Sequence, residues 1–191
     1  MVLPSNAYIN LAPDLKICRI LNGMWQVAGG HGNIDPNAAV EDMFTYHDYG
    51  FTTWDLADIY GPAEDFIGEF HRRIAIQRGR EEIKKIQTHT KFVPRPSRMS
   101  KQVVEQAVDT SRKKMLVDSI DLIQFHWWDY SNNAYHDALV HLQSLKDEGK
   151  IRHIGLTNFD TDRLQIIKDW GIEIVTNQIQ YSIIDQRPSV K

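Results

Sequence analysis

The stretch Phe51–Gly61 reads FTTWDLADIYG, and the feature in it that decides the fold is a carboxylate placed where a strand ends. Its first four residues, Phe51–Trp54, are of types that favour β-strands. Asp55 follows at the end of this predicted strand, and Tyr60 follows in the turn beyond it. The order of strand, carboxylic acid and phenol raises the question of whether other strands of the chain also end in polar side chains.

Apolar runs that are typical of strands recur along the chain with a period of about 33 residues. These runs are Ile17–Trp25, Phe51–Ala57, Lys85–Phe92, Ser119–Trp127, Ile151–Phe159 and Ile172–Gln180. The segments between them have helical patterns, over Pro36–Tyr49, Pro62–Ile76, Ser100–Leu116, Ala134–Glu148 and Asp160–Trp170. Strands that alternate with helices predict an α/β fold with a parallel sheet.

Two parallel architectures compete. A doubly wound sheet usually carries a GxGxxG fingerprint after its first strand, but the segment at 28–33 reads AGGHGN and does not match it. A TIM-type (β/α)8 barrel instead places its active site at the carboxyl ends of many strands. The ends of the predicted strands therefore decide between the two.

Those ends are polar from the second strand onward. The second strand ends in Asp55, the third in Lys91 and the fourth in His126. The fifth ends in Thr157 and Asn158, and the sixth in Asn177 and Gln178. In a barrel these ends meet at one rim, which predicts that Asp55, Tyr60, Lys91 and His126 cluster, with Lys91 within about 4 Å of Asp55.

The chemistry of this set is coherent. A free tyrosine has a pKa near ~10, and a nearby ammonium is expected to lower it. Lys91 can supply the ammonium, and Asp55 can keep Lys91 charged and oriented. His126 can share a hydrogen bond with the oxygen that Tyr60 protonates. The residues predict a general-acid site for a developing alkoxide.

The blocks DLADIYGPAE, THTKF, IDLIQFHWWD, GKIRHIGLTNF and NQIQYS resemble, in order, those of the aldo-keto reductases. The resemblance implies that Asp55, Tyr60, Lys91 and His126 are catalytic, with Tyr60 as the proton donor to a carbonyl that receives hydride from NADP(H). It also implies cofactor contacts by the residues Gly23, Met24, Thr157, Asn158 and Gln178. The expected function is reduction of aldehydes or ketones to alcohols.

The predicted barrel is incomplete, because about six βα units are counted in the 191 residues, against eight strands and about 250 residues in a full barrel. We expect one domain over residues 1–191, without the part of the barrel that in the family stacks on the nicotinamide and holds the cofactor phosphates. Its open sheet edges favour self-association. Three interpretations stay open: a truncated product, closure by a second copy, or a remnant without activity, of which the first is favoured.

The substrate site and the remaining residues are less well determined. Trp25, Trp127 and Trp128 follow strand ends and predict an apolar pocket for a small carbonyl substrate, although at least one of them could pack in the core. His89 shares strand parity with Lys91 and is expected to pack in the barrel interior. His71, His136 and His141 lie in helical segments and are expected to face solvent.

Composition limits the other function classes. The chain is 42% hydrophobic, with a net charge of −3 and no basic stripe, so we expect no nucleic-acid partner. No apolar run reaches membrane-spanning length, and no spacing suggests a metal site. One cysteine, Cys18, fits a reducing compartment, and we expect a cytoplasmic protein. The alternative function is an inactive or regulatory protein that keeps the fold without productive cofactor binding.

Overall fold

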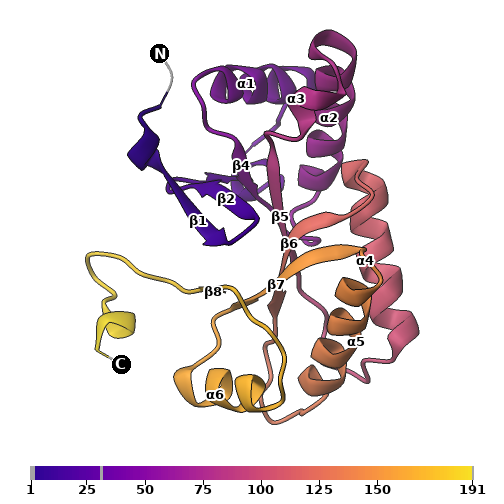
Figure 1. The fold of residues 1–191 in the computed structure, drawn as a ribbon, viewed down its shortest axis with the longest axis vertical. Helices are drawn as coiled ribbons and strands as arrows, with labels where there is room; N and C mark the ends of the chain where they lie inside the picture. Colours follow the sequence, from indigo (N-terminus) through magenta and orange to yellow (C-terminus); the bar gives the residue numbers. More distant parts are fainter. Residues whose placement is uncertain (1–2, 31, 191) are drawn as a thin grey trace.

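The computed structural model describes residues 3–30 and 32–190, and a six-stranded parallel sheet forms its centre (Figure 1). The strands follow their chain order across the sheet: β3 (Asn22–Gly23), β4 (Thr53–Asp55), β5 (Gln87–Phe92), β6 (Ile120–His126), β7 (Ile151–Thr157) and β8 (Asn177–Gln178). The sheet does not close on itself, so β3 and β8 are its two edges. The predicted α/β architecture, an open part of a (β/α)8 barrel, is confirmed.

A helical connection joins each pair of neighbouring strands, and the helices lie together on the outer side of the sheet (Figure 1). They are α1 (Pro36–Asp48), α2 (Ala63–Arg78), α3 (Arg80–Ile83), α4 (Lys101–Met115), α5 (Tyr135–Asp147) and α6 (Thr161–Asp169). Asp35, Ser100 and Asp160 cap α1, α4 and α6 by accepting hydrogen bonds from backbone N–H groups of the first turn.

The chain begins with a hairpin that covers part of the inner side of the sheet. Strands β1 (Tyr8–Ala12) and β2 (Leu15–Cys18) pair antiparallel, and Leu15 and Ile17 pack with Leu122 of β6. In the hairpin turn, Asp14 accepts a hydrogen bond from Arg152 at 3.0 Å and contacts His153 Nε2 at 2.8 Å. The hairpin is therefore fastened to the amino-terminal half of β7 and leaves the carboxyl ends of the strands uncovered.

Alternation along the strands separates an apolar outer layer from a polar inner one. On β6, Ile123 and Phe125 face the helices and are part of the main hydrophobic core, whereas Gln124 has the opposite parity. On β5, His89 and Lys91 share the inner parity and are 1% and 5% exposed. Thus His89 is buried, in agreement with its predicted place in the barrel interior.

Both predicted edge strands differ from the structure. The run Ile17–Trp25 is divided between the hairpin strand β2, the short strand β3 and a 3-10 turn η2 (Trp25–Val27). The apolar residues at its start cover the inner side of the sheet, and the sheet itself uses only two residues. The run Ile172–Gln180 is likewise reduced to Asn177–Gln178, and further 3-10 turns occur at Ser5–Ala7 and Arg187–Ser189.

Helices α2 and α4 pack very closely at Gly68. A Cβ atom at this position would lie 2.0 Å from the carbonyl oxygen of Lys114. Three residues further on, His71 is 3% exposed, and its Nδ1 lies 2.8 Å from the carbonyl oxygen of Met115. The prediction that His71 faces solvent is therefore wrong, since α2 turns this face toward α4. His136 and His141 are partly exposed.

We expect Gly68→Ala to lower the free energy of unfolding by about 3 kcal/mol or more, because the methyl group meets a backbone carbonyl that cannot rotate away. Alanine would by itself favour the helix by about 1 kcal/mol, which is too little to offset the clash. Urea unfolding followed by circular dichroism measures the difference. Gly30→Ala is the control, because a Cβ there meets nothing within 4 Å. A Gly68→Ala protein as stable as the wild type would contradict this packing.

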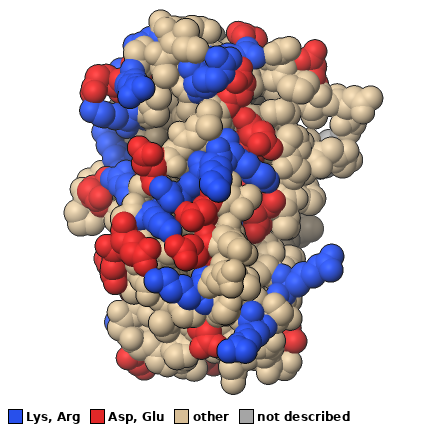
Figure 2. Space-filling model, turned by 90° about the vertical axis from the view of Figure 1, so that its right-hand side faces the viewer, with Lys and Arg blue, Asp and Glu red and all other residues tan. Residues whose placement is uncertain are grey.

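The outer helical face carries charges of both signs side by side (Figure 2). Several pair α4 with the segment after α5, as in Lys101–Glu148 and Lys150–Glu105. Mixed charges of this kind are typical of a solvated helical face. No helix within residues 3–30 and 32–190 is long and apolar enough to cross a membrane.

Candidate functional site

The predicted catalytic residues lie at the carboxyl end of the parallel sheet. Asp55 ends β4, Lys91 is the penultimate residue of β5, and His126 ends β6. Tyr60 lies in the loop between β4 and α2. Because neighbouring parallel strands end on the same side, residues from three segments far apart in the sequence are brought to one region.

Asp55 and Lys91 form a largely buried ion pair, in which Lys91 is buried and Asp55 is partly exposed. Lys91 Nζ lies 2.6 Å from Asp55 Oδ2 and also donates a hydrogen bond to the carbonyl oxygen of Leu56 at 3.1 Å. This distance confirms the predicted contact. Burial lowers the pKa of Lys91, and the Asp55 carboxylate acts in the opposite direction by favouring the charged ammonium.

Tyr60 lies against this pair through its ring. Lys91 Nζ is 5.3 Å from the ring centroid, and the Trp25 ring contacts Tyr60 edge-on at 5.0 Å. Partial burial and the Asp55 carboxylate raise the pKa of Tyr60, so the expected lowering by Lys91 does not hold for this state of the protein. The physical reason is that the ammonium donates to Asp55 and Leu56, and the carboxylate opposes a second negative charge nearby.

His126 is half-buried beside the same ammonium. Burial lowers its pKa, and the positive charge of Lys91 lowers it further. Both effects favour a neutral imidazole, which has one N–H to donate and one lone pair. The imidazole lies against the Trp128 ring, with a centroid distance of 4.1 Å.

The three tryptophans predicted to line a substrate pocket have different surroundings. Trp25 and Trp128 are 50% and 61% exposed near the site. Trp127 is 1% exposed, and its Nε1 donates hydrogen bonds to the carbonyl oxygens of Asp129 and Asn132. Trp127 is therefore a core residue, and its assignment to the pocket is wrong. Strand parity explains this, because Trp127 follows the inward-facing His126 and turns to the opposite side.

The loop that carries Tyr60 is fastened to β5 by Asp58. Both carboxylate oxygens of Asp58 accept from the backbone N–H of Val93, at 3.2 and 3.1 Å, and the Asp58 N–H donates to the carbonyl oxygen of Lys91 at 3.0 Å. Burial raises the pKa of Asp58 to about 6, the Val93 hydrogen bond lowers it, and the nearby Glu64 adds to the rise.

This pKa gives a prediction for stability against pH. An unfolded aspartate has a pKa of about 3.9, so the folded protein binds the Asp58 proton more tightly than the unfolded chain. The resulting stability is fully present below about pH 4 and is lost as the pH rises through about 6. The wild type should therefore lose about 3 kcal/mol of unfolding free energy across that window, and Asp58→Asn should lack this loss. Urea unfolding at several pH values tests this, and identical pH profiles for the two proteins would contradict it.

The predicted cofactor positions lie at the ends of β3, β7 and β8. Asn158 adopts a left-handed conformation with φ of 60°, and its N–H donates to the carbonyl oxygen of Gln178 at 2.8 Å. The hydroxyl oxygen of Thr157 is buried and has no hydrogen-bond partner among the described residues. Gly23 is exposed on β3, and the Met24 side chain is 5% exposed, so Met24 could meet a ligand chiefly through its backbone.

Two polar residues near the site were not predicted to contribute to it. Gln124 Nε2 donates a hydrogen bond to Asp55 Oδ1 at 2.8 Å. Asn177 holds the turn after β7, because its side chain accepts from the Phe159 N–H at 3.2 Å and donates to the Phe159 carbonyl at 2.8 Å. Gln124 had a signal in the sequence, since it is polar within an apolar strand and shares the parity of His126.

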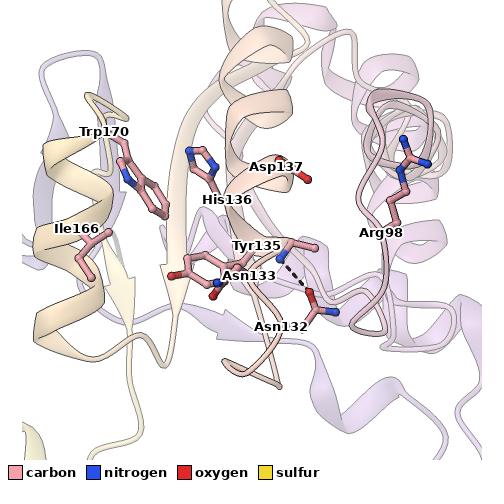
Figure 3. Close-up of a pocket in the computed structure, with 9 residues that line it drawn as sticks. Arg98, Asn132, Asn133, Tyr135, His136, Asp137, Ile166 and Trp170 are labelled. Atoms are coloured by element: carbon pink, nitrogen blue, oxygen red, sulfur yellow. Dashed lines mark hydrogen bonds between the residues drawn. The ribbon is translucent and has the colours of Figure 1, made fainter.

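A surface cavity of about 930 Å³ lies elsewhere, around the start of α5 and beside α6 (Figure 3). Ile166 of α6 and Trp170, directly after that helix, line one side of it, and Arg98 lines the other (Figure 3). None of the predicted site residues lines this cavity. The candidate site is therefore identified by its side chains and their contacts. Within the part of the chain that the structure describes, no group of three or more His, Cys, Asp or Glu residues could hold a metal ion.

Comparisons with known proteins agree on one family. The methylglyoxal reductase DkgA of Yersinia pestis is 39% identical over 85 residues, which are 44% of this chain and 31% of that protein. The NADH-specific methylglyoxal reductase of Escherichia coli is 26% identical over 189 residues, 91% of this chain and 58% of that protein. The crystal structure of an aldo/keto reductase from Brucella melitensis is 28% identical, with a TM-score of 0.75 over 96% of this chain and 66% of that one.

The chain thus spans about three fifths of the length of relatives that it matches along most of its sequence, 58% in one case and 60% in another. The model of the aldo/keto reductase family matches residues 19–191. This match and the open half-barrel show that the chain belongs to the aldo/keto reductase family.

Proposed function

We propose that this chain carries the catalytic residues of an NADP(H)-dependent reductase that converts aldehydes or ketones to alcohols. The observation that carries the proposal is the largely buried Asp55–Lys91 pair against the ring of Tyr60. A buried ion pair is often no more stabilising than apolar residues of similar volume. Packing alone therefore gives little reason for this pair, whereas a proton-transfer site gives a direct one.

Each residue has a separate role in the proposed reaction. When bound, a nicotinamide cofactor would supply the hydride that the carbonyl carbon receives. Tyr60 donates its hydroxyl proton to the carbonyl oxygen as negative charge develops there, and it regains a proton from solvent after each turnover. Lys91 stabilises the phenolate left on Tyr60, and Asp55 keeps Lys91 charged and in place. Neutral His126 donates a hydrogen bond to the same carbonyl oxygen.

The residues at the ends of β7 and β8 fit a nicotinamide carboxamide. This group needs both hydrogen-bond donors and acceptors, which the side-chain amides of Asn158 and Gln178 provide. The Thr157 hydroxyl next to them is buried without a hydrogen-bond partner in the described part of the chain. Gly23 and Met24 would approach the cofactor from β3. NADPH is the expected form, and NADH is the alternative that binding measurements compare.

The substrate is proposed to be a small carbonyl compound. Trp25 and Trp128 expose aromatic surface at the site and favour a substrate with an apolar or aromatic body. The two relatives described above are named methylglyoxal reductases, which adds a small dicarbonyl to the candidates. We further propose that the 191 residues form one domain and act in the cytoplasm, where the single Cys18 would stay reduced.

The experiment is a reductase assay on the purified chain, with NADPH or NADH and with methylglyoxal or benzaldehyde as the carbonyl compound. Loss of nicotinamide absorbance should be matched by alcohol formation, identified by mass spectrometry. Lys91→Met is the control for reduction by contaminants. Alcohol formed at the same rate by both proteins would contradict the proposed site.

The second candidate function is that of a binding or regulatory protein without turnover. The extent of the match favours it, since the chain spans only about three fifths of the length of a relative that is named as a reductase. A fluorescence titration with NADPH separates the candidates. Binding without alcohol formation would favour the second function, and binding with alcohol formation the first.

A further inference from the structure

Gln124 lies in the middle of the sheet, next to the proposed catalytic pair. It is 3% exposed, and its position on β6 is the register partner of Lys91 on β5. A buried side-chain amide that loses its hydrogen bonds costs about 1–3 kcal/mol, so this position requires a partner for the amide. Asp55 provides that partner at 2.8 Å.

Gln124 and Lys91 divide the two oxygens of the Asp55 carboxylate between them. Oδ1 accepts from the Gln124 amide, and Oδ2 accepts from the Lys91 ammonium at 2.6 Å. A carboxylate with one partner can rotate about its Cβ–Cγ bond, but a carboxylate with a partner on each oxygen has one preferred orientation. The Gln124 amide thus fixes the orientation of the Asp55 carboxylate in which Oδ2 is directed to Lys91.

We infer that Gln124 is a positioning residue, which holds Asp55 so that Lys91 stays charged and beside Tyr60. The inference rests on the proposed function for its catalytic meaning. The physical arrangement stands without it, because it concerns only the described contacts among Gln124, Asp55 and Lys91. Leu122, two residues earlier on the same side of β6, shows that an apolar residue can be accommodated on this inner side.

The test measures the ionisation of Lys91 directly. Protein is prepared with lysine labelled with ¹³C at Cε, and the Lys91 signal is identified by its absence in Lys91→Arg. NMR titration then gives the pKa of Lys91 in the wild type, Gln124→Leu and Gln124→Glu. Gln87→Leu is the matched control, because Gln87 also accepts side-chain hydrogen bonds within the sheet, from Thr52 and Thr53, and makes none with Asp55.

Gln124→Leu should lower the pKa of Lys91 by about one pH unit, because Asp55 is freed to turn away and burial then favours the neutral amine. Gln124→Glu should raise it, because a second carboxylate favours the ammonium. Gln87→Leu should leave it unchanged. Unchanged Lys91 titration in both Gln124 variants, or an equal change in Gln87→Leu, would overturn the inference. Should Gln124→Leu fail to fold, Gln124→Glu decides: a raised pKa of Lys91 supports the inference, and an unchanged or lowered one overturns it.

The same variants separate this inference from the proposed function. If the wild type reduces carbonyls, Gln124→Leu should lower kcat, shift its pH profile and leave the KM for the carbonyl compound little changed. If the Lys91 titration responds as expected but Lys91→Met reduces carbonyls as fast as the wild type, the positioning role stands and the proposed reaction fails. A lowered kcat with an unshifted pH profile and an unchanged Lys91 pKa would assign Gln124 a structural role only.

Discussion

Wherever carbonyl reduction by this protein is measurable, Tyr60→Phe is expected to abolish it while leaving the fold intact. General acid catalysis by a positioned side chain contributes roughly 10²–10⁴-fold, so the rate should fall by at least about 100-fold. The variant removes only the hydroxyl, and among the described residues this hydroxyl makes no hydrogen bond. The ring contacts with Trp25 and Lys91 do not require it. Stopped-flow or steady-state loss of NADPH absorbance measures the rate, and circular dichroism checks the fold.

Two further measurements make this result specific to proton transfer. NADPH should bind Tyr60→Phe about as tightly as the wild type, because the proposed cofactor contacts lie on other strands. Tyr46→Phe is a suitable control, since Tyr46 is an exposed tyrosine on α1. Turnover by Tyr60→Phe equal to that of the wild type would show that another group donates the proton.

The pH profile of the wild type adds information about the same group. Burial and Asp55 raise the pKa of Tyr60 above its ordinary value, so the acid form persists through neutral pH. Loss of activity on the alkaline side should therefore come only above about pH 10 if Tyr60 alone limits the reaction. A loss near neutral pH would show that the bound cofactor or the substrate changes the ionisation of Tyr60.

The meeting of residues at the strand ends could be predicted from the sequence, because all strands of a parallel sheet have their carboxyl ends on the same side. Asp55 and Lys91 are separated by 36 positions but lie in hydrogen-bond contact, and this followed from their places at the ends of neighbouring strands. The predictions for Trp127 and His71 are wrong, although the side-chain periodicity of strands and helices would have placed both residues correctly. Trp127 has the parity opposite to His126, and His71 lies one turn from the buried Ile67 on α2.

Other features could not be predicted from the sequence because they depend on how separate elements meet. The run Ile17–Trp25 has the apolar pattern of one strand, yet the protein uses its first residues to cover the inner side of the sheet. The direction in which the pKa of Tyr60 shifts depends on where the Lys91 protons point. Only the structure shows that they are directed to Asp55 and to the carbonyl oxygen of Leu56.

The 191-residue chain, tested alone, is expected to bind NADPH weakly and to turn over slowly or not at all. Holding reactants in a near-attack geometry can contribute roughly 7–11 kcal/mol to a rate. Asn158 and Gln178 could fix one end of the nicotinamide. The resemblance to the family implies that the face of the nicotinamide and the phosphates are held by a seventh strand and the loops after it. The described residues form six parallel strands in an open sheet.

The chain is also expected to self-associate, but the structure points to a cause other than the open sheet edges. The edge strands β3 and β8 pair over only two residues each, and short edges are poor templates for further strands. The segment after β8 instead exposes large apolar side chains, including Ile183 at 93% and Ile184 at 97%. We therefore expect association through this segment, and Ile183→Glu combined with Ile184→Glu should reduce it.

Two measurements on the purified chain decide the matter: the Kd for NADPH from fluorescence, and the mass in solution across a dilution series. Weak binding by a chain whose mass falls on dilution is the expected result, with the mass lowered further in the double variant. Micromolar or tighter binding by a strict monomer would contradict it. The phosphates would then be held by groups already present in this open sheet, and the exposed segment after β8, which leads away from Gln178, would be the first place to look for them.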